Sequence, residues 1–217
     1  LVTLELTGIT VSFNSAPLEW WLSLPIIVIY PLLFGWVSYQ TATKLAEHKR
    51  RLQVMSTRDG MTGVYNRRHW ETMLRNEFDN CRRHNRDATL LIIDIDHFKS
   101  INDTWGHDVG DEAIVALTRQ LQITLRGSDV IGRFGGDEFA VIMSGTPAES
   151  AITAMLRVHE GLNTLRLPNT PQVTLRISVG VAPLNPQMSH YREWLKSADL
   201  ALYKAKKAGR NRTEVAA

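Results

Sequence analysis

The chain has 217 residues, of which 44% are hydrophobic and 22% are charged, and its formal net charge is +3. This composition provides enough apolar residues for one ordinary folded domain, and the small net charge gives no support for a nucleic-acid-binding protein. The single cysteine, Cys81, excludes an intrachain disulfide and is consistent with a reducing compartment.

The first part of the chain differs in character from the rest. Residues 20–39 contain no charged side chain, and a helix of that length can cross the hydrocarbon core of a membrane. Aromatic residues typical of a membrane interface lie near both ends of this stretch: Trp20, Trp21, Trp36 and Tyr39. A buried helix of a soluble domain is the alternative, but two interior prolines, Pro25 and Pro31, disfavour it. We therefore predict that residues 1–39 are the end of a membrane sensor region, with a transmembrane helix over about 20–39.

Positive charge begins only after this apolar stretch. No Lys or Arg precedes residue 20, which disfavours a signal peptide. Four basic residues and one acidic residue between positions 44 and 51 account for the whole net charge of the chain. By the positive-inside rule, the part of the chain that follows is predicted to be cytoplasmic. Residues 40–58 are predicted to form a helical juxtamembrane linker, either a solvated connector or a short parallel dimer helix.

Residues 59–217 are predicted to form one α+β domain. Helical periodicity indicates four helices, at 66–86, 109–126, 148–165 and 190–208. Apolar runs and turn residues indicate four strands, at 88–94, 129–134, 138–144 and 173–182. The order of these elements favours a sheet of hairpin-paired strands with flanking helices.

The strand predicted at 88–94 is a continuous apolar run that ends in carboxylates. Asp94 and Asp96 occupy alternate positions, so we expect their side chains on the same face. Downstream, Lys99 provides a point charge suited to a phosphate. Asn102 and Asp111 provide the mixed donors and acceptors that a purine edge requires.

The segments 129–134 and 138–144 are separated by Gly135-Gly136, which predicts a hairpin with a tight turn. Two carboxylates, Asp137 and Glu138, stand at the exit of this turn. An ordinary solvated hairpin with an acidic tip is the simplest interpretation. Mg²⁺, however, prefers one or two carboxylates together with phosphate oxygens and water. A carboxylate from this turn and one from the strand end would therefore hold the ion of a nucleoside triphosphate.

At these residues the sequence resembles the GGDEF-domain diguanylate cyclases, and the resemblance extends from about Asp59 to Arg212. It is carried by the segments Asp59–Arg68, Asp94–Lys99, Gly106–Asp111, Gly135–Phe139 and Ser178–Ala182, and by Ala198, Asp199, Tyr203, Lys206, Gly209, Arg210 and Asn211. It implies the ferredoxin-like palm sheet of nucleotidyl cyclases with flanking helices, here preceded by the predicted transmembrane helix. It also implies catalysis by a homodimer. The chain is similar to membrane-anchored enterobacterial cyclases of the cellulose and biofilm pathway, which implies a bacterial inner (plasma) membrane location.

The resemblance implies that two GTP molecules condense into cyclic di-GMP and two pyrophosphates. Mg²⁺ or Mn²⁺ would be held by Asp94, the Ile95 carbonyl and Asp137. Asp137 would also accept the proton of the attacking hydroxyl, with Glu138 in support, and Lys99 would stabilise the transition state.

The resemblance also implies a substrate site and a regulatory site. Substrate contacts are implied for Phe98, Asn102, His107, Asp111, Lys206 and Arg210. Lys206 and Arg210 would bind the β- and γ-phosphates, one helical turn apart. Because an aspartate accepts from the N–H donors of guanine, which adenine lacks, Asp111 predicts guanine selectivity. Arg126 and Asp129 have the R-x-x-D spacing of a product-inhibition site, although a surface ion pair is the simpler interpretation of that spacing alone.

Two other functions remain open from the sequence. The first is a catalytically silent receptor that binds GTP or cyclic di-GMP and acts as a membrane signalling scaffold. The presence of Asp94, Lys99, Asp137 and Glu138 argues against it, because silent members of the family commonly lack these residues. The second is a scaffold for a partner protein, with cyclase activity secondary.

Overall fold

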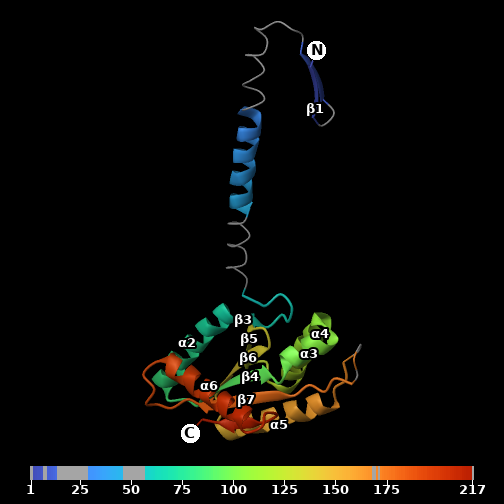
Figure 1. Cartoon of the computed structure of the whole chain (residues 1–217). Coiled ribbons are helices and arrows are strands. Elements are labelled where there is room, and N and C mark those ends of the chain that lie inside the picture. Colours follow the sequence, from blue (N-terminus) through green and yellow to red (C-terminus); the bar gives the residue numbers. More distant parts are fainter. Residues whose placement is uncertain are drawn as a thin grey trace. The chain divides into compact units, whose positions relative to one another are not determined.

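The computed structural model describes residues 2–6, 9–13, 29–45, 57–167, 170 and 172–216. The chain divides into two compact units, residues 1–55 and residues 56–217 (Figure 1).

In the first unit, β1 (Val2–Leu6) pairs in antiparallel register with β2 (Ile9–Phe13), and residues 29–45 are helical. Every side chain of that helix is exposed, including large apolar ones such as Leu32 and Phe34. Within the described part of the chain, no helix has both the length and the apolar character required to cross a membrane. The first half of the predicted span, residues 20–28, lies outside the described residues, as does most of the predicted linker, residues 46–56.

The second unit is built on a six-stranded mixed sheet with the order β3-β5-β6-β4-β7-β8. The strands are β3 (Tyr65–Asn66), β4 (Ala88–Ile95), β5 (Val130–Gly135), β6 (Glu138–Ser144), β7 (Ile177–Pro183) and β8 (Thr213–Val215). The four central strands pair in antiparallel register, and the short outer strands β3 and β8 add to them in parallel. The structure therefore confirms the α+β class and the mixed sheet with flanking helices.

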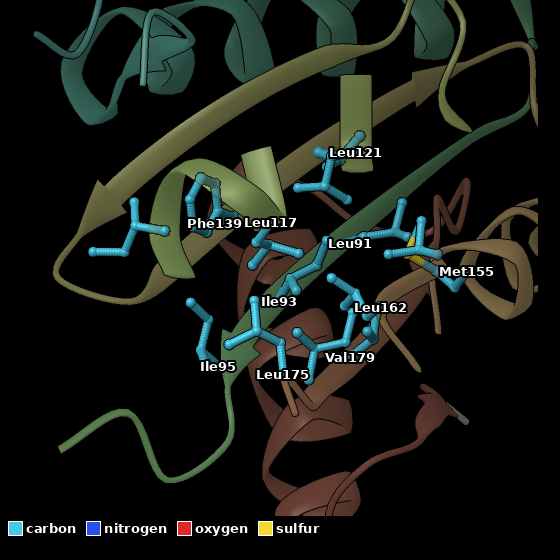
Figure 2. Close-up of a cluster of buried hydrophobic side chains, with 14 of the residues drawn as sticks. Leu91, Ile93, Ile95, Leu117, Leu121, Phe139, Met155, Leu162, Leu175 and Val179 are labelled. Carbon is cyan, nitrogen blue, oxygen red and sulfur yellow. The ribbon is translucent and has the colours of Figure 1, made fainter. Parts of the chain in front are cut away.

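Strand β4 forms the centre of the domain because all of its residues are buried, and its side chains alternate between two hydrophobic clusters. Leu91 and Ile93 point into the larger cluster, which α4 (His107–Thr124) and α5 (Ala148–Thr164) cover (Figure 2). Leu90 and Ile92 point into the other, which α2 (Arg67–His84) and α6 (Tyr191–Lys207) cover. Because two helices pack on each face of the sheet, β4 is held firmly in place between them.

The helix boundaries follow from local chemistry. The side chain of Asn66 accepts a hydrogen bond from the His69 N–H at 3.0 Å and caps the start of α2. Asn85 ends that helix in the left-handed conformation, at a φ of 50°. The four predicted helices and the four predicted strands all occur, with boundaries shifted by a few residues.

Four elements of this unit differ from the sequence prediction, and the first is the two-residue strand β3, which was not predicted. Helix α3 (Phe98–Trp105) was not predicted, because its eight residues span only about two turns, too few for a helical period to stand out, although Phe98 and Ile101 pack against the core. Strand β8 is a three-residue edge strand whose pairing with β7 is not encoded locally. Strand β7 begins at Ile177 rather than 173, because Ile95 at the end of β4 is its last pairing partner. The buried side chains of residues 173 and 175 gave the pattern of a longer strand.

Cys81 is buried on α2, and its thiol lies 3.2 Å from a Glu77 carboxylate oxygen. Burial and this neighbouring carboxylate raise the pKa of Cys81 to about 12. We expect iodoacetamide to alkylate Cys81 in the folded protein at pH 8 roughly a thousandfold more slowly than in the urea-unfolded protein, because the reactive species is the thiolate. Mass spectrometry of timed samples measures both rates. Similar rates would show that α2 opens readily.

Candidate active site

The predicted hairpin forms, and its turn depends on glycine. Gly135 and Gly136 have φ values of 144° and 50°, and the register of β5 with β6 shifts between Arg133 and Gly135. Asp137 and Glu138 follow directly, at the exit of the turn. The backbone therefore projects two acidic residues from the tip of a hairpin whose following strand, β6, is buried in the sheet.

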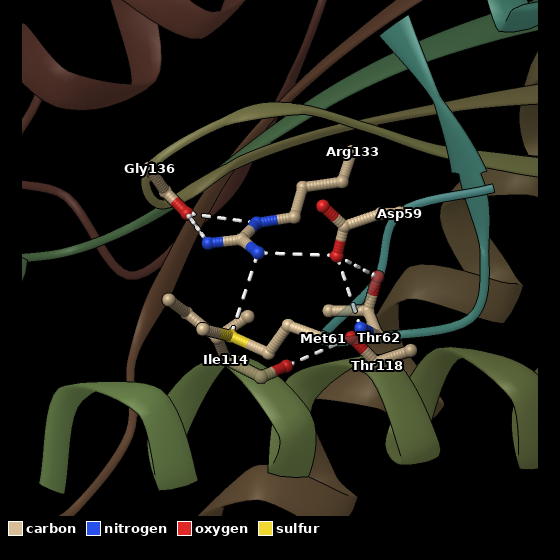
Figure 3. A network of polar contacts seen from close by, with 7 residues as sticks. All are labelled: Asp59, Met61, Thr62, Ile114, Thr118, Arg133 and Gly136. Carbon is tan, nitrogen blue, oxygen red and sulfur yellow. Dashed lines mark hydrogen bonds and ion pairs between the residues drawn. The ribbon is translucent and has the colours of Figure 1, made fainter. Parts of the chain in front are cut away.

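Arg133 contacts both this turn and the segment 59–62, which precedes β3 (Figure 3). Its guanidinium donates two hydrogen bonds to the Gly136 carbonyl, at 3.1 and 2.8 Å, and forms an ion pair with Asp59 at 3.1 Å. Asp59 also accepts from the backbone N–H and the hydroxyl of Thr62, at 3.0 and 2.7 Å. Although burial opposes the effect, the hydrogen bonds from Thr62 and Arg133 hold the pKa of Asp59 below its usual value. The segment 59–62 and the acidic hairpin are therefore physically connected.

We expect Arg133→Ala to lower the free energy of unfolding by about 2 kcal/mol, because it leaves the half-buried Asp59 carboxylate without its cation. Because the turn that carries Asp137 also loses its support, enzymatic turnover should fall roughly tenfold. Denaturant unfolding and initial rates measure the two effects. Arg83→Ala, an exposed position on α2, is the matched control and should change neither. Unchanged stability of Arg133→Ala would show that this network is not formed in solution.

The end of β4 lies beside the hairpin tip. Asp94 is the register partner of Glu138, and the Ile95 N–H donates to the Asp137 carbonyl at 3.3 Å. Burial raises the pKa of Asp94; the carboxylates of Asp137 and Glu138 raise it further, against the lowering effect of Lys206. The structure thus brings together three acidic residues that the sequence placed on two separate elements.

Lys206, near the end of α6, lies at this acidic cluster. Its Nζ is 2.7 Å from an Asp94 carboxylate oxygen, and both side chains are largely buried, with 33% and 11% exposed. The sequence predicted Lys206 as a phosphate ligand and did not predict this ion pair, because 112 residues separate the partners. Another neighbour that the sequence did not predict is Asp199 on α6, whose pKa is raised by burial and by the charge of Glu138.

The acidic cluster offers some, but not all, of the ligands that a divalent cation needs. Within the described residues, no group of three or more His, Cys, Asp or Glu side chains could hold a metal ion on its own. Asp94 and Asp137, with the adjacent Ile95 carbonyl, form a smaller oxygen donor set that fits an ion bound mainly through phosphate oxygens and water. Burial is the main cause of the raised pKa of Asp94 and the charges of Asp137 and Glu138 add to it; a cation at this position would offset both.

The predicted purine-reading residues lie where α3 packs against α4. Asn102 has a buried Oδ1 with no hydrogen-bond partner in the described structure. A Cβ on Gly110 would lie 1.9 Å from that atom and 3.2 Å from the Phe98 ring, so glycine leaves room for both side chains. Asp111 follows and lines a cleft of about 650 Å³ along α4. Asn102 does not line that cleft, so the structure does not bring these two residues to one surface. Each is an acceptor suited to N–H donors.

Three further predicted residues are exposed and have no polar contact with the acidic cluster among the described residues. Lys99 lies on α3, and His107 is the first residue of α4. Arg210 lies beyond the end of α6, in a turn with a φ of 63°, so the prediction that it stands one helical turn from Lys206 is wrong. The helix ends at Lys207, because Gly209 takes a φ of 110°.

The R-x-x-D segment forms a separate site before β5. The Arg126 N–H donates to Asp129 Oδ2 at 2.9 Å, while Asp129 Oδ1 is buried with no partner in the described structure. Burial raises the pKa of Asp129, against the lowering effect of Arg126. Both residues line a cavity of about 210 Å³ together with Arg157 of α5. Arg157 therefore lies beside Arg126 and Asp129 within one chain.

Comparison with known proteins agrees with this geometry. Residues 56–212 match the family "Diguanylate cyclase, GGDEF domain". Diguanylate cyclase DosC from Escherichia coli is 35% identical over 159 residues, which cover 72% of this chain and 34% of DosC. Cyclic di-GMP phosphodiesterase NbdA from Pseudomonas aeruginosa is 30% identical over 193 residues, which cover 83% of this chain and 25% of NbdA. The chain thus spans about a third or less of these curated relatives.

The solved structures give the same answer for the fold. The GGDEF domain of DgcB from Caulobacter crescentus, in complex with c-di-GMP, superimposes with a TM-score of 0.70 at 30% identity. The match covers 74% of this chain and 96% of that domain. Family, sequence and fold agree over the second unit of the structure, and the chain belongs to the family of GGDEF-domain diguanylate cyclases.

Proposed function

We propose that this protein is a diguanylate cyclase that condenses two GTP molecules into cyclic di-GMP and two pyrophosphates. The observation that carries the proposal is the convergence of Asp94, Asp137, Glu138 and Lys206 at the hairpin tip. Interacting carboxylates with perturbed pKa values are typical of catalytic sites.

In the proposed reaction, each of two chains presents one GTP, and the 3′-hydroxyl of each nucleotide attacks the α-phosphate of the other. Asp137 accepts the proton of the attacking hydroxyl, with Glu138 beside it. Asp94, Asp137 and the Ile95 carbonyl would hold Mg²⁺ or Mn²⁺, which when bound neutralises charge on the phosphates.

Cations of the chain would stabilise the phosphates. We propose that Lys206, paired with Asp94 in this structure, turns to the β- and γ-phosphates when the nucleotide is bound, together with Arg210. Lys99 stabilises the transition state. Asn102 and Asp111 select guanine, and Phe98 and His107 lie along the nucleotide. The buried unpaired oxygen of Asn102 supports this assignment, because a guanine N–H would satisfy it.

Incubation of the purified protein with GTP and Mg²⁺, followed by nucleotide chromatography, tests the proposal. Cyclic di-GMP and pyrophosphate should accumulate together, and ATP should give no product. If GTP persists while cyclic di-GMP binds, the silent-receptor alternative is correct.

We further propose that cyclic di-GMP inhibits the enzyme at the cavity lined by Arg126, Asp129 and Arg157. An arginine can form two hydrogen bonds with a phosphate or with guanine O6 and N7, and the unpaired Asp129 oxygen can accept guanine N–H groups. The cavity has the cations and the free acceptor that such a ligand requires.

Arg126→Ala is therefore expected to weaken cyclic di-GMP binding roughly tenfold to a hundredfold, the typical contribution of a charge-assisted hydrogen bond. Initial rates should remain near wild type, because the cavity is separate from the hairpin tip. Calorimetric titration and progress curves with pyrophosphate removed measure the two effects. Arg157→Ala should act in the same direction, while Arg83→Ala, an exposed position on α2, serves as control. An unchanged product affinity in both variants would refute the inhibitory site.

Membrane anchoring through residues 20–39, an inner-membrane location with a cytoplasmic catalytic domain and a homodimer for catalysis complete the proposal. The described part of the predicted span supports anchoring, because its helix exposes Ile29, Leu32, Leu33, Phe34 and Val37. We also propose a role in the cellulose and biofilm pathway. Detergent extraction of the native protein from washed membranes tests the anchor.

A further inference from the structure

The carboxylate of Asp96 contacts two other conspicuous segments of the sequence, through Ser178 and Asn211. The proposed reaction gives none of these three residues a role. Asp96 follows β4, two positions after Asp94, and only 5% of it is exposed. Its Oδ1 accepts from the Ser178 hydroxyl at 2.7 Å, and its Oδ2 accepts from the Asn211 backbone N–H at 2.8 Å. Whereas Asp94 pairs with Lys206 at the acidic cluster, Asp96 connects β7 with the turn that follows α6.

That turn has an unusual backbone. Gly209, Arg210 and Asn211 have φ values of 110°, 63° and 47°. The left-handed region is unfavourable for residues other than glycine, so two consecutive residues hold it only where surrounding contacts fix them. The Arg210 N–H donates to the Ala205 carbonyl at 3.0 Å, and the Asn211 N–H donates to Asp96. Asp96 therefore holds the side of the turn that faces the sheet.

The Arg210 side chain is exposed, and no hydrogen bond or ion pair of its guanidinium occurs in the described structure. The backbone of the turn therefore decides where this side chain begins and which way it can extend. We propose that Asp96 is a positioning residue for the triphosphate: by fixing the turn through Asn211, it presents Arg210 to the β- and γ-phosphates. This inference rests on the proposed role of Arg210 in the nucleotide site.

Asp96→Asn is the sharpest test, because it preserves the shape of the side chain. Asparagine has one acceptor oxygen for the Asn211 N–H and an N–H₂ group that can bond to Ser178 only if that hydroxyl reverses to accept. Both hydrogen bonds then lose the charge of the carboxylate, which weakens the hold on the turn. Affinity for α,β-methylene GTP, measured by calorimetry with Mg²⁺, should fall roughly tenfold, as for a lost hydrogen bond to a charged group. Affinity for guanosine, which has no phosphates, should change less than about twofold. Asp79→Asn, an exposed position on α2, is the matched control and should change neither.

A double-mutant cycle separates positioning from general damage. If Asp96 acts through Arg210, adding Asp96→Asn to Arg210→Ala should cause no further loss of affinity for the GTP analogue. Independent losses that add, or an equal loss of guanosine affinity, would overturn the inference. If Arg210→Ala alone leaves the affinity unchanged, the proposed phosphate role of Arg210 fails, whatever Asp96 does.

Ser178→Ala provides a second variant if Asp96→Asn does not fold. It removes one of the two donors to Asp96 and leaves the Asn211 contact in place. We expect a loss of roughly threefold for the GTP analogue and none for guanosine, because the carboxylate is less firmly oriented. An equal loss for guanosine would overturn the inference, since the effect would then not be specific to the phosphates.

Discussion

Asp137→Ala is expected to reduce cyclic di-GMP synthesis by at least about a thousandfold while the fold is retained. Asp137 is the proposed proton acceptor and a proposed metal ligand, so its loss removes two contributions to transition-state stabilisation. Its carboxylate makes no hydrogen bond or ion pair among the described residues, and the position is partly exposed, so no cavity or orphaned donor results. The measurement is product formation by the purified variant at saturating GTP.

Stability and ligand binding provide the controls for this result. Because the charge of Asp137 opposes ionisation of Asp94, its removal should leave the unfolding midpoint unchanged or slightly raised. Binding of cyclic di-GMP at the Arg126 cavity should be retained. Asp103→Ala, an exposed acidic position on α3, is the matched substitution and should keep full activity. Activity of Asp137→Ala above a tenth of wild type would refute the assigned role.

Elements whose signals are local were predictable from the sequence. The apolar run of β4 and the Gly135-Gly136 turn each carry their own pattern, so the central strand and the hairpin were found. Helix α3 and strand β8 are too short for their patterns to stand out: the first spans about two turns, and the second exists only through its pairing with β7. Their formation is determined by the rest of the domain rather than by their own residues.

In the candidate site, too, local motifs were predictable and contacts between distant segments were not. The motifs predicted that Asp94 and Asp137 act together, and the structure brings their strands together. Contacts between distant segments were not predictable: Arg133 meets Asp59 across 74 positions in the chain, and Asn211 meets Asp96 across 115. Such pairs depend on the packing of whole elements, and a single sequence contains no spacing rule that selects one partner among many charged residues.

A buried glycine connects this packing to the proposed chemistry. Gly180 lies in β7, where α6 crosses the sheet, and a Cβ there would stand 2.2 Å from the Ala198 carbonyl oxygen and 2.3 Å from the Leu202 nitrogen. Both atoms belong to the backbone of α6, so no side chain can move aside to make room. The helix itself would have to shift, and it carries Lys206 near its end.

Gly180→Ala is therefore expected to lower the free energy of unfolding by about 3 kcal/mol, at the upper end of the usual effect of overpacking. Because the displaced helix takes Lys206 away from Asp94, affinity for a GTP analogue should fall as well. Gly127→Ala is the matched control: a Cβ there meets no atom within 4 Å, so its stability should change by less than about 1 kcal/mol. Denaturant unfolding and calorimetry measure the two effects. Wild-type stability of Gly180→Ala would mean that α6 packs less closely on β7, and Lys206 would then have no fixed place at the acidic cluster.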